Sequence, residues 1–303
     1  MKRAFYGTLG CSISKSTLST ASLSKIYWAV SISKLLYGCD IRYFHYDELK
    51  LYESQHRIMA KEILRLPLIS PNPYCLSAIG WNSNEYFIDK MKFMFAWRIL
   101  NLPVDNIYRK VFVLRLIKII YSRIYLCESP VAEFVNLCHK YNVLGKVTNL
   151  ILLSDIPCKS EWSRYTKGLV KDRQLLLWRR TLKMYSNLII YLEISYQYEK
   201  LCWVDLSKHE RHLRDACNTI TRLICGNCSL AMYKYHTPEL KICKYCNIND
   251  KECLFHFIMI CEKFSDDRKF MFDKIYYSVK QVTKDILINI PPKKMYNKRR
   301  LLE

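Results

Sequence analysis

The sequence predicts a mainly α-helical chain, because apolar residues recur at helical spacing and turn-forming residues are scarce. The 303 residues include 7 glycines and 9 prolines, whereas all-β folds need frequent turn residues. Half of the residues are hydrophobic, so the chain can bury real cores and is not a disordered tail. We expect helical regions over 1–102 and 103–220, a small metal-binding module over 221–280 and a basic tail over 281–303.

Three amphipathic helices are expected in the first hundred residues. The first has an N-cap at Ser22 or Ser24, and the second has one at Asp47. The second helix stops before the prolines that begin at Pro67, and the third starts near Glu85. Apolar positions recur every three or four residues along each helix, which predicts a buried stripe. These stripes are Leu23, Ile26, Tyr27, Val30 and Leu35; Leu51, Tyr52, Ile58, Met59, Ile63 and Leu66; and Phe87, Ile88, Met91, Phe95 and Ile99.

The chain carries a large positive charge, with 48 Lys and Arg against 27 Asp and Glu and a formal net charge of +21. Such an excess repels itself in a compact chain unless a polyanion is bound. Nucleic acid is the expected partner, because Lys and Arg release condensed counterions from its phosphates. A membrane surface and a lysine-rich bias in composition are the alternatives. We expect no membrane partner and no small-molecule substrate. The basic side chains expected to contact nucleic acid are Arg57, Lys61, Arg65, Lys92, Arg98, Arg179 and Arg180.

The cysteine content and the N-terminus predict a reducing compartment. The chain has 14 cysteines, but the residues after Met1 lack the clean apolar core of a signal peptide. The most apolar run, 111–127, is interrupted by Arg115, Lys118 and Arg123, so it predicts a basic amphipathic helix and not a transmembrane one. We expect an intracellular protein, nuclear or cytoplasmic.

A possible metal site lies near the C-terminus. Cys243 and Cys246 are separated by two residues, His256 follows after nine more, and Cys261 after another four. Two cysteines at this spacing can bind one ion from a single tight turn, while a later His and Cys complete a tetrahedron. Thiolate and imidazole ligands suit Zn²⁺. A closed site of this kind is structural and not catalytic.

Other cysteines compete for the same metal. Cys225 and Cys228 form a second C-x-x-C, which would make a four-cysteine site with Cys243 and Cys246. Cys253 is a further thiol, and any of these cysteines can instead be a small buried apolar residue. The sequence therefore predicts a zinc site within 225–261 and leaves its set of ligands open.

The same region resembles the C-terminal zinc knuckle of non-LTR retrotransposon reverse transcriptases. The resemblance rests on Thr221-Arg-Leu-Ile-Cys225-Gly-Asn-Cys228-Ser-Leu230, on Cys243-x-x-Cys246, and on Glu252-x-x-x-His256-Phe-x-x-x-Cys261-x-x-Phe264-x-x-x-Arg268. Ser229 and Glu262 stand where that family usually has proline. The resemblance implies that Cys243, Cys246, His256 and Cys261 are the zinc ligands, with Cys225 and Cys228 outside the set.

The N-terminal part is similar to the thumb that follows the polymerase palm in these enzymes. The similarity rests on Arg3-Ala-Phe-Tyr6, Leu35-Leu-Tyr-Gly38, the run from Leu51 to Pro67 and Ile79-Gly80. Between the two regions, Leu177-Trp-Arg-Arg-Thr-Leu182, Ser186-Asn-Leu188 and Tyr191 match more loosely. The resemblance implies a thumb-like region over 1–102, a connector, and a zinc-knuckle module over 221–280. Such a fragment would hold nucleic acid for a polymerase portion elsewhere.

No catalytic centre is expected. The string Phe264-Ser-Asp-Asp267 looks like the carboxylate turn that holds Mg²⁺ in polymerases, but it follows a predicted metal ligand and suits a helix start. His209 and His212 near Glu210 are expected to be solvated surface groups. Within the zinc module, Tyr245 could stack on unpaired bases, whereas Phe255 and Phe257 are expected to be buried. The alternative from another class is a zinc-stabilised helical protein-interaction module that no longer binds nucleic acid.

Overall fold

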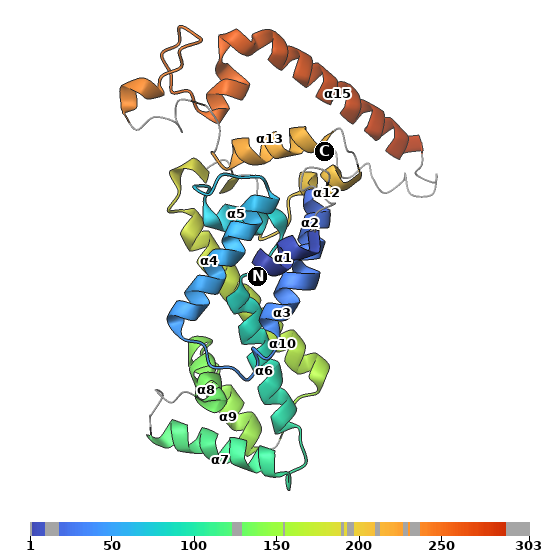
Figure 1. Ribbon diagram of the computed structural model, residues 1–303. Coiled ribbons are helices and arrows are strands. Elements are labelled where there is room, and N and C mark those ends of the chain that lie inside the picture. Colours follow the sequence, from blue (N-terminus) through green and yellow to red (C-terminus); the bar gives the residue numbers. More distant parts are fainter. Residues whose placement is uncertain are drawn as a thin grey trace. The chain divides into compact units, whose positions relative to one another are not determined.

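The computed structural model describes residues 2–9, 18–122, 129–153, 155–188, 191–192, 197–209, 213–226, 230 and 237–288. As predicted, the described chain is mainly helical (Figure 1). It divides into a first unit, Met1–Asn227, and a second unit, Cys228–Glu303. Most of the predicted basic tail, residues 289–303, lies outside the described residues.

The first unit begins with helices that surround an aromatic core. Their bounds are α1 Lys2–Leu9, α2 Thr20–Ile26, a π-helix Tyr27–Ile32, α3 Ser33–Leu36, α4 Tyr46–Ile63, α5 Asn72–Ile79 and α6 Asn84–Leu100. Gly80 ends α5 in the left-handed conformation with φ 74°, which glycine adopts without steric cost. In the core, the rings of Tyr27 and Trp81 are stacked with centroids 4.5 Å apart.

The rest of the first unit adds a second core. The helices are α7 Ile107–Ser122, α8 Pro130–Lys140, α9 Leu144–Leu152, α10 Lys159–Leu182, a 3-10 turn Ser186–Leu188, α12 Cys202–His209 and α13 Arg214–Ile224. The long helix α10 contributes to both cores. Trp178 and Leu182 pack in the first core, while Trp162 and Val170 pack in the second with Phe93. This shared helix places the regions predicted as thumb-like and connector in one unit.

The second unit has little helical packing of its own. It contains 3-10 turns Pro238–Lys241 and Glu262–Phe264, a π-helix His256–Ile260, and α15 Ser265–Ile288. Within its described residues, the extended pairing is a single antiparallel bridge between Ile242 and Lys251. A module with so small a core depends on other cross-links for its stability.

The helix starts differ from two of the predicted caps. Ser19, and not Ser22 or Ser24, caps α2, because its extended backbone lets its hydroxyl accept from the Ser22 amide at 3.1 Å. The second helix begins after His45, so Asp47 lies inside its first turn, where a carboxylate also favours the helix. The third helix is capped by Ser83, close to the predicted start. Of the predicted stripe on α4, Met59 and Ile63 are buried whereas Leu51 is exposed.

Candidate metal centre

The second unit brings Cys243, Cys246, His256 and Cys261 together, so that one ligand atom from each lies within 4.8 Å of the others. Cys243 Sγ is 3.8 Å from Cys261 Sγ, and Cys246 Sγ is 3.4 Å from His256 Nε2. Three of these residues are buried, and Cys246 is half-buried. These are the four residues that the sequence singled out, and they could hold one metal ion.

Two local structures position these ligands. The first is a tight loop closed by the Ile242–Lys251 bridge, in which the Cys243 amide donates to the Asp250 carbonyl at 2.9 Å. Asn249 in this loop has φ 55°, a left-handed conformation that asparagine tolerates. The second is the π-helical turn, in which the Cys261 amide donates to the His256 carbonyl at 2.8 Å. This turn puts His256 and Cys261 at its two ends.

Contacts around the ligands orient them. The His256 Nδ1 atom is buried without a hydrogen-bond partner, and it lies 3.6 Å from Asp250 Oδ2. With Nε2 facing Cys246, this arrangement suits an imidazole that binds a metal through Nε2 and carries its proton on Nδ1 toward a carboxylate. The Arg268 guanidinium donates to the carbonyl oxygens of Met259 and Cys261, which ties the start of α15 to the site. Sequence analysis did not identify Asp250, because an isolated acidic residue in a loop has no distinctive spacing.

If the three cysteines of this cluster were all thiolates, their negative charges would repel one another. Burial raises the pKa of the Cys243 thiol to about 11, and hydrogen bonds with the Cys246 and Cys261 thiols add to this increase. Three thiolates this close together need a cation to balance their charge. The donor set therefore fits a soft divalent ion.

Of the competing cysteines, Cys225 and Cys253 are not part of this cluster. Cys225 is fully buried in the core of the first unit, where its thiol donates to the Arg222 carbonyl at 3.3 Å. Cys228 lies outside the described residues. The Cys253 sulfur accepts from the His256 amide at 3.3 Å and is not among the four clustered side chains.

The aromatic residues of the second unit differ partly from expectation. Tyr245 is 61 % exposed, which leaves its ring open to a ligand. Phe257 is half-buried and packs edge-on to Phe264 with centroids 4.8 Å apart. The expectation that Phe255 is buried is wrong, since the residue is 58 % exposed while its neighbours Leu254 and His256 are buried.

The side chains predicted to contact nucleic acid fall into different environments. Arg179 and Arg180 are exposed on α10. Arg98 is exposed but pairs with Asp40 at 2.5 Å. Arg57 and Arg65 are half-buried.

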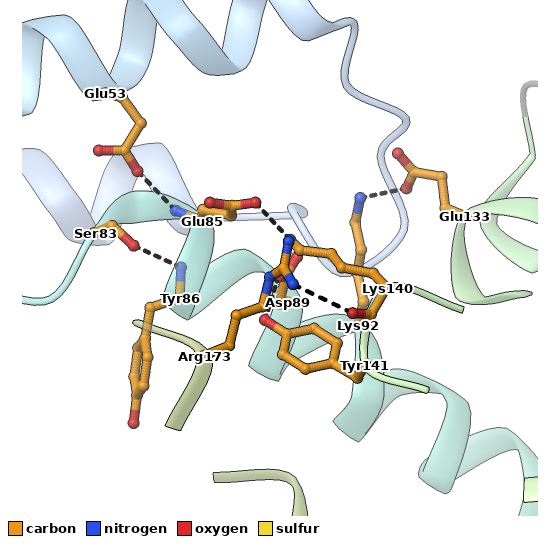
Figure 2. A network of polar contacts seen from close by, with 10 residues as sticks. All are labelled: Glu53, Ser83, Glu85, Tyr86, Asp89, Lys92, Glu133, Lys140, Tyr141 and Arg173. Carbon is orange, nitrogen blue, oxygen red and sulfur yellow. Dashed lines mark hydrogen bonds and ion pairs between the residues drawn. The ribbon is translucent and has the colours of Figure 1, made fainter. Parts of the chain in front are cut away.

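Two of the residues predicted to contact nucleic acid, Lys61 and Lys92, are buried. The Lys61 ammonium group donates to the Leu68 carbonyl at 2.6 Å, and the side chain is anchored there by the turn that follows α4. Lys92 forms an ion pair with Glu133 of α8 (Figure 2). Because both side chains are buried, Lys61 and Lys92 are not included among the residues proposed to contact nucleic acid.

The polymerase-like string Phe264-Ser-Asp-Asp267 lies at the start of α15. Asp266 and Asp267 are exposed in the first turn of α15, where carboxylates stabilise a helix N-terminus. His212 and Glu210 lie outside the described residues, and so does the side chain of His209.

The fold and the site define a mainly helical protein with a Cys₃His group that could hold a metal ion. The chain matches no family model, no curated protein sequence and no solved structure. Among the described helices, none combines the length and the apolar character needed to cross a bilayer.

Proposed function

We propose that this chain is a zinc-stabilised, nucleic-acid-binding portion of a reverse transcriptase of the non-LTR retrotransposon type, without catalytic activity of its own. The observation that carries the proposal is the convergence of Cys243, Cys246, His256 and Cys261. The sequence resemblance and the net charge of +21 supply the rest.

Zinc is the proposed metal because the ligand spacing fits its bond lengths. Sulfur ligands about 2.3 Å from a tetrahedral zinc lie about 3.8 Å apart, and a sulfur and a nitrogen ligand lie about 3.6 Å apart. The Cys243–Cys261 sulfur separation is 3.8 Å, and the Cys246–His256 separation is 3.4 Å. The ion would hold the loop of Cys243 and the π-helical turn together.

Nucleic acid is the proposed partner because exposed basic and aromatic groups are present. Arg179 and Arg180 would contact phosphates, a mode of binding that is salt-sensitive and largely sequence-independent. The exposed Tyr245 ring would stack on an unpaired base. RNA, DNA or both are compatible with these contacts.

Titration of single-stranded RNA at several salt concentrations tests this function. We expect affinity to fall with rising salt, and Arg179→Gln/Arg180→Gln to reduce the slope of log K against log salt by about 1.4 if both residues contact phosphate. The control is Lys159→Gln/Lys171→Gln, which removes the same charge from exposed positions of the same helix. Equal slopes for the two double variants would show that only net charge matters, and no binding at low salt would refute the function.

The second candidate is a zinc-stabilised protein-interaction module, favoured by the outer face of α7. Ile107, Leu114 and Tyr121 recur every seven residues on this helix and are 64 %, 66 % and 84 % exposed. An apolar row in this position is typical of a surface that a partner covers. Absence of RNA binding at low salt in the same titration would favour this candidate.

A further inference from the structure

A cavity of about 350 Å³ lies inside the first unit, lined by residues of α4, α5, α6 and α10. This volume is within the range of small-molecule sites in proteins. The lining combines apolar side chains such as Leu76 and Val170 with the aromatic rings of Tyr86 and Trp178. Leu177 at the cavity is 40 % exposed, whereas Trp178 is 6 % exposed, so the lining runs from solvent into the core.

Three polar atoms on this lining are shielded from solvent and have no hydrogen-bond partner in the described part of the chain. They are Glu53 Oε2, Gln174 Oε1 and Arg173 Nε. A buried polar atom without a partner destabilises the folded chain, so three around one cavity call for an explanation.

Each of these side chains is held in place by its other polar atoms. Glu53 Oε1 accepts from the Glu85 amide at 2.9 Å, so the second carboxylate oxygen is left unused (Figure 2). Arg173 Nη1 donates to the Lys140 carbonyl at 3.4 Å. Gln174 hydrogen-bonds to the Tyr198 hydroxyl. The unused atoms therefore belong to side chains that are already oriented, which is the usual state of a preformed binding site.

The unused atoms define the hydrogen bonds that a ligand must supply. Glu53 Oε2 and Gln174 Oε1 accept, and Arg173 Nε donates, so the complementary ligand offers two donors and one acceptor. The Watson–Crick edge of guanine has this composition, with its imino and amino N–H groups beside a carbonyl oxygen. Adenine lacks the imino donor, and cytosine and uracil each offer one donor group and two acceptors. The planar base also suits a cavity lined by Tyr86 and Trp178.

We propose that this cavity binds guanine, with Glu53 and Gln174 accepting from the base and Arg173 donating to its carbonyl oxygen. Guanine could arrive as a free nucleotide or as an unpaired base of a strand, and Arg57 on the lining supplies a cation for the phosphate of either. The lining includes neither the four clustered metal-site residues nor Arg179 and Arg180, so the proposal extends the proposed function without depending on it.

Calorimetric titration of the full chain with GMP and with AMP tests the proposal. We expect GMP to bind at least about tenfold more tightly than AMP, because a site with buried hydrogen-bonding groups discriminates against a ligand that leaves them unpaired. Glu53→Gln keeps an accepting oxygen for the Glu85 amide and puts a donating NH2 group in place of the unused oxygen, so it should abolish this preference. Gln174→Met removes the second acceptor, so it should weaken GMP binding and reduce the preference for GMP over AMP. Glu199→Gln, at an exposed position, is the matched control and should change nothing.

A short oligoadenosine with and without one central guanosine distinguishes the two sources of the base. A preference for guanine among the mononucleotides, among the oligonucleotides or among both supports the site. If the preference is found with only one kind of ligand, that ligand is the source of the base. Equal binding of guanine and adenine in both arms, or a preference that survives both Glu53→Gln and Gln174→Met in variants that melt like the wild type, would overturn the proposal.

Discussion

His56 is a buried titratable residue whose neutral form is fixed by its partners. Its ring is stacked with Trp81, with centroids 5.0 Å apart. The Nε2 atom lies 3.0 Å from the Asn82 carbonyl oxygen, which can only accept, so Nε2 carries the proton. The Nδ1 atom then accepts from the Tyr27 hydroxyl at 2.9 Å. Protonation of Nδ1 would break this bond and place a charge inside an aromatic core.

Stability of the first unit should therefore fall in mild acid. Burial lowers the pKa of His56 from about 6.5 in the unfolded chain to about 4. Between these two pH values His56 is protonated in the unfolded chain but neutral in the folded one. The free energy of unfolding therefore falls as the pH drops below 6.5, by about 3 kcal/mol at pH 4.

Urea unfolding of the wild type and of His56→Gln at several pH values measures this loss of stability. The difference in the free energy of unfolding between the wild type and His56→Gln should change between pH 6.5 and pH 4. The control His139→Gln, at an exposed position, should show the same pH dependence as the wild type. The same pH dependence in His56→Gln and the wild type would contradict the proposed role of His56.

Between elements, α6 and α8 are joined by polar contacts in addition to apolar packing. Lys140 near the end of α8 donates to Glu85 Oε1 at 2.5 Å and forms an ion pair with Asp89, while the Tyr141 hydroxyl donates to Asp89 at 2.7 Å (Figure 2). Burial raises the pKa of Asp89, and the Lys140 ammonium group opposes that increase. The neighbouring pair of Lys92 and Glu133 is similarly shielded from water.

Removal of Lys92 should weaken this junction strongly. Lys92→Met leaves the Glu133 carboxylate, whose other oxygen accepts from the Phe44 amide, without its counter-ion in a shielded position. We expect a loss of about 3–5 kcal/mol in the free energy of unfolding. The double variant Lys92→Met/Glu133→Gln removes the unpaired charge and should recover much of this loss. A loss below about 1 kcal/mol for the single variant would mean that the pair behaves as a solvated surface contact.

The burial of Lys92 against Glu133 shows what helical periodicity can and cannot predict. Spacing in the sequence identified α6 and the apolar character of Ile88, which is buried as expected. It could not show that α8 would also pack against α6 and supply Glu133 to Lys92, because that partner is far away in the sequence. The polar atoms of Glu53, Arg173 and Gln174 around the cavity were missed for the same reason. The convergence of Cys243, Cys246, His256 and Cys261 was predicted by their spacing together with the family resemblance, whereas spacing alone left Cys225, Cys228 and Cys253 as alternatives.

At the scale of the whole molecule, the two units differ in what stabilises them. The first unit has two large apolar cores, whereas the described part of the second has short turns around four ligand side chains. Binding of a metal by such a module contributes directly to its folding.

We expect His256→Ala to unfold residues 237–270 and to leave the first unit folded. Limited proteolysis followed by mass spectrometry checks this, with His139→Ala as control; protection of the second unit in His256→Ala would contradict it.

The zinc content of the purified full-length chain tests the central claim most directly. We expect one zinc per chain in the wild type and almost none in His256→Ala, with the Cys225→Ser/Cys228→Ser variant retaining the metal. Wild-type protein without zinc would contradict the account. So would retention of zinc in His256→Ala together with its loss from Cys225→Ser/Cys228→Ser, which would assign the metal to the four-cysteine site.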